Sequence, residues 1–233
     1  MRAEFAQWRH VFKLDPAKDI DDASLHKLAD SGTDAFIVGG SDDVTAANTY
    51  ELYTRIRKFD LPIILEVTNE EAVVPGFDHY FIPTVLNTKD VKWIIGKHQQ
   101  VVKQFEFPLP WDQIAAEAYV ILNANCKAAQ LAQADASLSL EDICAYAKLA
   151  EHFYRFPIFY MEYSGAYGNM EWVKTVRREL HHARLFYGGG IDNEEKAVLA
   201  SQAADTIVVG NIIYENLEQA LSTAAAVKRS KLF

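Results

Sequence analysis

Eight short runs rich in β-branched and aromatic residues recur along this chain, and most are followed by a stretch with the apolar spacing of a helix. This alternation constrains the fold more than any single motif does, because repeated strand–helix units build a parallel sheet that helices cover. The predicted strands lie at residues 10–14, 35–40, 62–67, 79–85, 117–122, 157–163, 184–188 and 206–210.

Seven intervals between or after these strands carry a helical pattern. They lie at residues 23–29, 45–58, 91–105, 140–153, 170–178, 194–200 and 214–227. The interval at residues 69–77, between the third and fourth strands, is too short for another helix and contains Pro75 and Gly76, which interrupt helices. We therefore expect one helix of the regular series to be missing.

Eight strand–helix units favour closure into a barrel, and 233 residues are close to the roughly 250 that one such barrel needs. The predicted fold class is α/β, a single (β/α)8 TIM-barrel domain over residues 1–233, modified by the missing helix between strands 3 and 4. An open doubly wound sheet is the alternative, but residues 13–16 read KLDP where that fold usually has a glycine-rich turn. Residues 124–139 are expected to form a long loop over the active face or against a partner.

The acidic composition disfavours a nucleic-acid partner. With 32 Asp and Glu against 23 Lys and Arg, the net charge of −9 means that the average surface repels nucleic acid phosphates and anionic lipid headgroups. Residues 1–20 lack the apolar core of a secretory signal, no apolar run approaches ~20 residues, and Cys126 and Cys144 show no metal-ligand spacing. We expect a cytoplasmic protein without a transmembrane segment, for which transient contact with a membrane surface stays open.

Glycines mark the ends of the last two predicted strands, with YGGGI at residues 187–191 and VVGN at residues 208–211. Glycine lets backbone N–H groups approach an anion closely, and many barrels bind phosphate between these two loops. The pattern predicts a phosphate site, although tight turns without a ligand would carry the same residues.

The run YMEYSG at residues 160–165 ends strand 6. Strand alternation sends Tyr160 and Glu162 to one face and Met161 and Tyr163 to the other. A carboxylate in a barrel mouth is costly unless it is used, so Glu162 is a candidate base or hydroxyl-orienting group, with a structural ion pair to Lys13 as the rival interpretation. An aromatic side chain here could stabilise a developing carbocation through its π-face.

Three polar residues end the first two strands. Lys13 and Asp15 share a face of strand 1, and Ser41 follows strand 2. Carboxylate and hydroxyl oxygens suit Mg²⁺, which often binds phosphate or diphosphate as well. Asp15 before Pro16 could instead be an ordinary turn former.

The chain resembles the PcrB family of geranylgeranylglyceryl phosphate synthase relatives, from about residue 8 to residue 228. The resemblance implies a prenyltransferase that joins the hydroxyl of sn-glycerol 1-phosphate to a long polyprenyl diphosphate of heptaprenyl type. It also implies an ether product, released diphosphate, a homodimer, and a barrel that lacks its third helix. The shared motifs occur in order as HVFKLDP (10–16), GGS (39–41), VPGFDHYFIPTVLN (74–87), YMEYSG, YGGGI and VVGN.

Residue roles follow from the same resemblance. Asp15 and Ser41 are expected to hold Mg²⁺ on the diphosphate, while Glu162, Tyr160 and Lys13 are expected to be catalytic. The residues implied to bind glycerol 1-phosphate are Lys13, Tyr160, Met161, Glu162, Tyr163, Ser164, Gly165, Gly190, Gly210 and Asn211.

The predicted helix at residues 91–105 is where the donor chain is expected to lie. Its apolar stripe is predicted to face inward, and in the resembling family bulk near this helix limits the length of the prenyl chain. Val101 is modest in size, which supports a heptaprenyl over a geranylgeranyl donor, unless Val101 is simply a core residue. The stripe consists of Val91, Ile94, Ile95, His98, Val101, Val102 and Phe105.

Two other functions remain open. A phosphate-binding barrel isomerase or lyase needs an acid and a base on opposite sides of its substrate, but has no use for an apolar groove. A non-catalytic lipid-phosphate binding protein needs neither a base nor a metal on a leaving group, so the combination of Asp15, Ser41 and Glu162 argues against it. No DDxxD, HExxH or GxSxG element occurs in the chain.

Overall fold

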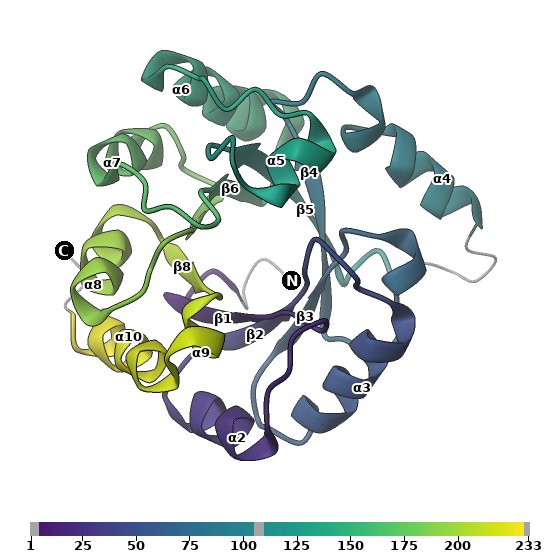
Figure 1. Ribbon diagram of the computed structural model, residues 1–233. Helices are drawn as coiled ribbons and strands as arrows, with labels where there is room; N and C mark the ends of the chain where they lie inside the picture. Colours follow the sequence, from purple (N-terminus) through teal and green to yellow (C-terminus); the bar gives the residue numbers. More distant parts are fainter. Residues whose placement is uncertain (1–4, 105–109, 231–233) are drawn as a thin grey trace.

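Eight parallel strands close into a barrel in their sequence order, which confirms the predicted fold class. The computed structural model describes residues 5–104 and 110–230, and Figure 1 looks along the barrel. Each predicted strand is present, with ends that differ by up to three residues. The strands are β1 His10–Leu14, β2 Ala35–Val38, β3 Ile63–Glu66, β4 His79–Val85, β5 Ile114–Ile121, β6 Ile158–Glu162, β7 Arg184–Gly188 and β8 Thr206–Val209.

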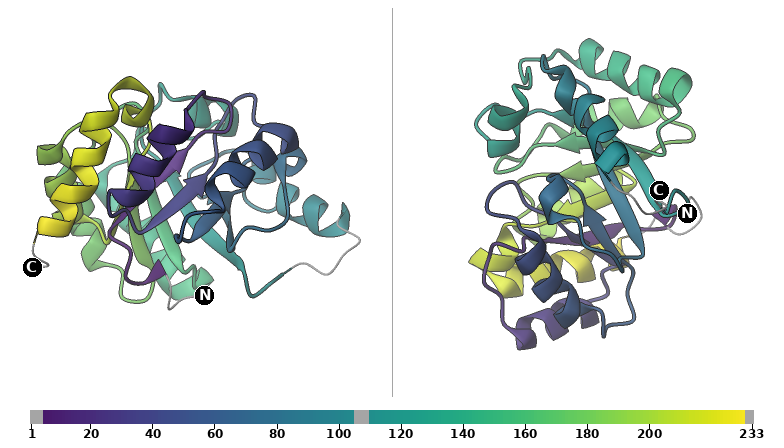
Figure 2. Two further views of the ribbon diagram at one scale, coloured as in Figure 1. Left: turned by 90° about the horizontal axis from the view of Figure 1, so that it is seen from below. Right: turned by 90° about the vertical axis from the view of Figure 1, so that its right-hand side faces the viewer.

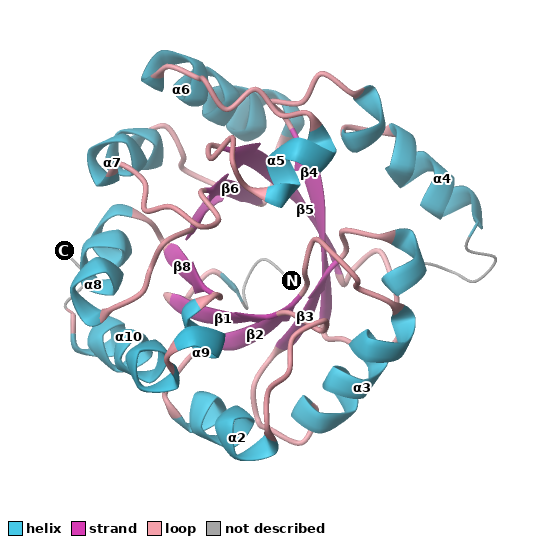
Figure 3. Ribbon diagram, viewed as in Figure 1, coloured by secondary structure: helices cyan, strands magenta, loops and turns pink. Residues whose placement is uncertain are grey.

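Helices surround the strands, as Figure 3 shows by colour. Each predicted helix is present, but residues 91–105 and 214–227 are each divided into a short turn and a longer helix, and residues 140–153 into an α-helix and a π-helix. The helices are α2 Asp22–Asp30, α3 Ala46–Ile56, η1 Glu70–Ala72, η2 Val91–Trp93, α4 Gly96–Gln104, α5 Lys127–Ala132, α6 Leu140–Lys148, η3 Leu149–Tyr154, α7 Met170–Arg178, α8 Glu194–Ala203, α9 Ile212–Glu215 and α10 Leu217–Arg229.

The connection between β3 and β4 lacks a full helix, as predicted. In the part of the chain that the structure describes, this connection contains a single 3₁₀ turn, η1. Gly76 there has a φ of 109°, which favours glycine, and its N–H donates to the Tyr80 hydroxyl at 3.1 Å. The expected long loop at residues 124–139 differs, because α5 begins there at a Cys126 cap that accepts a hydrogen bond from the Ala129 N–H.

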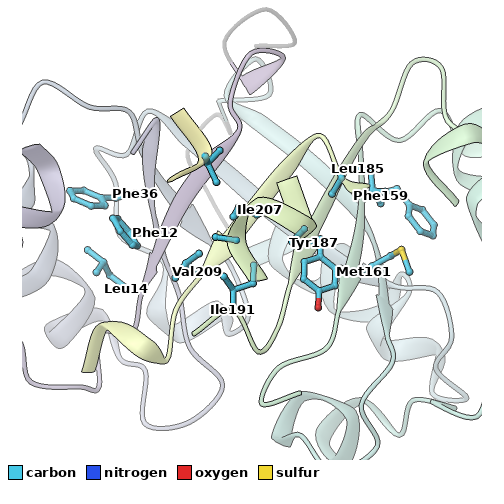
Figure 4. Packing of buried hydrophobic residues seen from close by; sticks show 14 of the residues in the cluster. Phe12, Leu14, Phe36, Phe159, Met161, Leu185, Tyr187, Ile191, Ile207 and Val209 are labelled. Atoms are coloured by element: carbon cyan, nitrogen blue, oxygen red, sulfur yellow. The ribbon is translucent and has the colours of Figure 1, made fainter. Parts of the chain in front are cut away.

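Alternation along the strands divides the buried residues into two layers. Inward residues such as Val11, Tyr119 and Tyr160 fill the barrel, whereas the alternate residues pack against the helices. Figure 4 shows part of this outer layer, in which Met161 and Tyr187 lie among aliphatic side chains. The chemistry of the site therefore comes from the inward set.

Helix α4 corrects the prediction of an inward apolar stripe over residues 91–105. Val91, Ile95 and Val102 are 65%, 63% and 47% exposed, and α4 stands away from the other helices in Figures 1 and 2. The stripe assumed one continuous helix, but the chain forms a 3₁₀ turn with a shorter repeat before α4 starts at Gly96, so the apolar residues do not share one face. Phe105 lies outside the described residues.

Candidate active site

One large cavity opens at the C-terminal ends of the strands and has a volume of about 1010 Å³. One part, under the ends of β6, β7 and β8, is bordered by glycines and polar side chains, and we call it the polar pole. The other part runs between β4, η2 and α4 and has apolar walls, and we call it the apolar flank. Active sites of such barrels lie at this end, so the cavity is the candidate site.

Glu162 ends β6 and points into the cavity, with 6% of the residue exposed. Its Oε2 accepts a hydrogen bond from the Tyr119 hydroxyl at 2.6 Å, and its Oε1 accepts one from the Ser164 N–H at 2.6 Å. Burial raises the pKa of the Glu162 carboxyl, although Lys13 and the Tyr119 hydroxyl favour its ionised form. A carboxyl fixed through both oxygens and with a raised pKa is suited to accept a proton.

Lys13 forms its ion pair with Glu66, at 2.5 Å between Nζ and Oε2. Burial disfavours the charged lysine, but Glu66 and Glu162 outweigh that effect and raise the pKa of Lys13. The rival interpretation, that Glu162 serves as the ion-pair partner of Lys13, is therefore wrong. Lys13 lines the cavity, its raised pKa favours the charged form, and Glu162 keeps its own hydrogen bonds.

Tyr160 lies deep in the barrel, stacked on Tyr119 with ring centroids 4.5 Å apart. A Cβ atom on Gly188 of β7 would come within 2.3 Å of the Tyr160 hydroxyl oxygen. Glycine at position 188 is therefore required for the tyrosine to reach its place. Tyr160 thus stacks on the tyrosine whose hydroxyl donates to Glu162, and its role beside a reacting centre stays a prediction.

The rest of the YMEYSG run divides between two sides of β6. Ser164 and Gly165 line the cavity, and Gly165 has a φ of 81°. The side chains of Met161 and Tyr163 pack in the layer between barrel and helices, as strand alternation predicts. The resemblance implied that both residues bind glycerol 1-phosphate. Neither is among the residues that line the cavity, and their role in binding stays a prediction.

The predicted phosphate residues meet at the polar pole. Gly190, Gly210 and Asn211 all line the cavity, together with Gly189. Gly189 and Gly190 have φ values of 138° and 60°, which favour glycine, and a Cβ atom on Gly190 would lie 2.4 Å from the Tyr167 backbone nitrogen. The short helix α9 follows directly, an arrangement that barrels commonly use to bind phosphate.

The two predicted metal ligands, Asp15 and Ser41, line the cavity on the side of β1 and β2. Gly40 leaves room for the carboxylate, because a Cβ atom there would lie 2.4 Å from Asp15 Oδ1. Over residues 5–104 and 110–230, no three Asp, Glu, His or Cys side chains gather in a group that could hold a metal ion. A carboxylate and a hydroxyl together fit an Mg²⁺ ion that takes its other ligands from water and diphosphate.

Val101 lines the apolar flank together with His98 and Val102 of the predicted stripe, whereas Val91, Ile94 and Ile95 do not line it. Two tryptophans face the same space, one from η2 and one from the segment before β5. Apolar walls suit a hydrocarbon chain, because contact with them removes its surface from water. The apolar residues that line the flank include Ile82, Val85, Trp93, Val101, Val102, Trp111, Ile114 and Leu131.

Sequence reasoning missed Tyr119 and Lys18. Tyr119 orients Glu162, and strand alternation could have found it, since it lies two residues after the inward Glu117 on β5. Lys18 reaches the Asn211 side chain at 3.3 Å and lies 4.9 Å from the Tyr214 ring centroid. No local motif marks Lys18, because only barrel closure brings β1 beside β8.

Residues 3–228 match the model of the PcrB family. The chain is 55% identical to a heptaprenylglyceryl phosphate synthase of Geobacillus sp. (strain WCH70), over 97% of this chain and 99% of that protein. It is 56% identical to the enzyme of the same name from Geobacillus kaustophilus, over 97% and 95% of the two chains.

Solved structures show the same fold. The (S)-3-O-geranylgeranylglyceryl phosphate synthase of Thermoplasma acidophilum, crystallised with sn-glycerol-1-phosphate, superimposes with a TM-score of 0.81 at 24% identity, covering 97% and 96% of the chains. A tryptophan synthase α chain from Legionella pneumophila gives 0.55 at 15% identity, covering 96% of this chain and 91% of that one. The sequence matches are long and specific, and this chain belongs to the PcrB family.

Proposed function

We propose that this protein transfers a long polyprenyl group, of heptaprenyl type, from its diphosphate to the hydroxyl of sn-glycerol 1-phosphate. The similarity to heptaprenylglyceryl phosphate synthases over 97% of the chain supports the reaction class. The two parts of the cavity match the two substrates, since one offers glycine backbone to a phosphate and the other offers apolar walls to a hydrocarbon chain.

The glycerol phosphate binds at the polar pole, with its phosphate against the backbone of Gly189, Gly190 and Gly210. Its hydroxyl then lies toward Glu162, the fixed carboxylate below this rim. Glu162 takes the hydroxyl proton while the oxygen bonds to the allylic carbon of the donor. The bond between that carbon and the diphosphate breaks, and diphosphate leaves with the electron pair.

Lys13 and Tyr160 support this transfer. The Lys13 ammonium lines the cavity and favours anionic phosphate and diphosphate there. The Tyr160 ring, held against Tyr119, offers its π-face to positive charge that develops on the allylic carbon. Bound Mg²⁺, held by Asp15 and Ser41, would neutralise charge on the departing diphosphate.

The observation that carries the proposal is the position of Glu162 between a glycine-rich rim and an apolar groove. Labelled sn-glycerol 1-phosphate is incubated with Mg²⁺ and a ladder of polyprenyl diphosphates, and the product is analysed for an ether bond. An acid-stable ether with a preference for long donors is expected. Absence of an ether with every donor would contradict the proposal and favour the isomerase, lyase or binding alternatives.

The metal role has its own test. Asp15→Ala should weaken Mg²⁺-dependent use of the donor more than binding of glycerol phosphate, because its carboxylate belongs to the diphosphate side. Asp19→Ala is the matched control, since Asp19 is an exposed carboxylate outside the cavity on the same connection. Full activity in the presence of a chelator would remove Mg²⁺ from the reaction, and normal turnover of Asp15→Ala would remove Asp15 as its ligand.

A homodimer and a cytoplasmic location stay predictions. Among the described residues, no helix is both long and apolar enough to span a bilayer. Light scattering coupled to gel filtration would test the homodimer.

A further inference from the structure

The apolar flank continues onto the outside of the protein through a surface that we call the η2–α4 surface, made of residues 89–103 and Trp111. We propose that this surface docks on an anionic lipid bilayer, so that the prenyl donor passes from the membrane into the cavity. The inference uses the proposed function to explain its purpose, but its physical basis is independent of the reaction.

Four exposed large apolar side chains, those of Val91, Ile95, Val102 and Trp111, belong to this surface. Val91 and Ile95 are 65% and 63% exposed, and Trp111 is 63% exposed beside the cavity. Exposed aliphatic residues grouped with a tryptophan are typical of surfaces that enter the boundary between lipid headgroups and acyl chains. Water solvates these apolar side chains poorly, so removing them from water is favourable.

The charge of this segment has the opposite sign to that of the whole chain. Residues 89–103 contain four lysines, Lys89, Lys92, Lys97 and Lys103, against one acid, Asp90, which gives +3 where the chain carries −9. Lys92 pairs with Asp90 at 2.8 Å, Lys97 with Glu70 at 3.2 Å and Lys89 with Asp135 at 3.9 Å, so two acids from other elements also face these lysines. Ion pairs at a surface stabilise little, so lipid phosphates can compete for these lysines.

The surface and the cavity are continuous. Lys92, Lys97, Val102 and Trp111 line the cavity and also belong to the surface. A second copy of the chain seated here would cover the mouth through which the donor enters. A bilayer would instead supply the donor, because a long prenyl chain is more stable in lipid than in water.

The test measures binding to vesicles without any substrate. The full-length protein is sedimented with vesicles of phosphatidylglycerol and phosphatidylethanolamine, and separately with phosphatidylcholine alone. Binding to the anionic vesicles is expected, falling with added salt. Ile95→Glu should weaken it about tenfold or more, because an aliphatic side chain that would enter the bilayer becomes a charge. Lys89→Gln should weaken it about fivefold for anionic vesicles only.

The matched control is Leu199→Glu, which changes an apolar residue that is 44% exposed on α8, away from α4. Its vesicle binding should equal that of the unchanged protein. Ile95 does not line the cavity, so Ile95→Glu should keep normal turnover of a short, water-soluble allylic diphosphate.

Three outcomes would overturn the inference. The unchanged protein could fail to bind anionic vesicles, or Ile95→Glu could bind as well as Leu199→Glu, or Ile95→Glu could dissociate a dimer while neither form binds lipid. If ether is formed without vesicle binding, the docking inference alone is wrong. If the protein binds vesicles but no donor yields an ether, the proposed function is wrong and the docking inference stands.

Discussion

The polar pole and the apolar flank of the same cavity are built in different ways. At the polar pole, Glu162 is held through both oxygens and Gly188 lets Tyr160 reach its place. On the apolar flank, α4 contains no buried side chain among those described, and several of its residues face water. A phosphate of fixed size can be bound by a rigid frame, whereas a long flexible chain needs only an apolar path.

The missing helix explains much of this difference. Each of the other strand-to-strand connections contains an α-helix, but between β3 and β4 the described chain has only the turn η1. Glu70 of that turn pairs with Lys97 of α4 at 3.2 Å, so a polar contact joins the two where a helix would have packed. Residues of this connection and of η2 and α4 line the cavity together, so the apolar flank lies beside the missing helix.

The largest expected effect is at the polar pole. Glu162→Gln keeps the shape but cannot accept the hydroxyl proton, so turnover should fall by roughly 10²- to 10⁴-fold. Affinity for glycerol 1-phosphate, measured by calorimetry, should change little. The matched control is Glu117→Gln, another buried carboxyl on the inner face that does not line the cavity. Equal losses of turnover and affinity in Glu162→Gln would make Glu162 a binding residue.

The second largest effect should fall on use of the prenyl donor at the apolar flank, without a change at the polar pole. Val101→Trp should block the groove and shift preference toward shorter donors by roughly tenfold or more, while affinity for glycerol phosphate stays unchanged. Val91→Trp makes the same substitution in the same segment, but Val91 is exposed and outside the cavity. If the Val101→Trp protein is folded and uses the original donors, the prenyl chain runs elsewhere.

A third change tests the phosphate position. A Cβ atom on Gly210 would lie 3.6 Å from the Lys13 carbonyl oxygen, which is ordinary contact, so Gly210→Ala should fold. Its methyl group should hold the phosphate off the backbone and weaken glycerol phosphate binding by about tenfold. Gly96→Ala on α4 is the control and should leave that affinity unchanged. Gly190 is a poorer choice, because its positive φ and close backbone neighbours would confuse misfolding with lost binding.

The fold was predictable because strand alternation and turn residues are local signals. All eight strands were expected, and Pro75 and Gly76 marked the gap before β4. The helix at residues 91–105 was predicted less well, because its apolar residues serve a groove and an outer surface instead of a core. Periodicity assumes that apolar residues are buried, and that assumption is wrong where they face a cavity or water.

The sequence predicted which residues form the site better than it predicted which of them contact one another. Strand ends identified Lys13, Glu162 and the glycines, but not the Lys13–Glu66 ion pair or the Tyr119–Glu162 hydrogen bond. Both contacts join residues more than 40 positions apart in the sequence, one between β1 and β3 and the other between the neighbouring strands β5 and β6. Their geometry depends on how the strands are staggered in the closed barrel, which no local motif encodes.

Glu117 gives the smallest expected effect on turnover and the clearest effect on stability. It lies inside the barrel with no exposed surface, and within the described chain neither carboxylate oxygen has a hydrogen-bond partner. Burial, followed by repulsion from Glu66, raises the pKa of Glu117 well above its usual range. The folded state therefore keeps a proton on Glu117 that the unfolded state releases above about pH 4.3.

The sign of the pH dependence follows. Because the raised pKa belongs to the folded state, its contribution to stability is complete below pH ~4.3 and is lost as the pH rises toward the folded pKa. Gln does not titrate, so Glu117→Gln removes this loss. The unfolding free energy of Glu117→Gln, relative to that of the unchanged protein, should therefore rise by roughly 1.4 kcal/mol per pH unit over that window. Chemical denaturation at several pH values measures this difference. A constant difference across pH would show that Glu117 is ionised in the folded barrel, with a partner that restores its usual pKa.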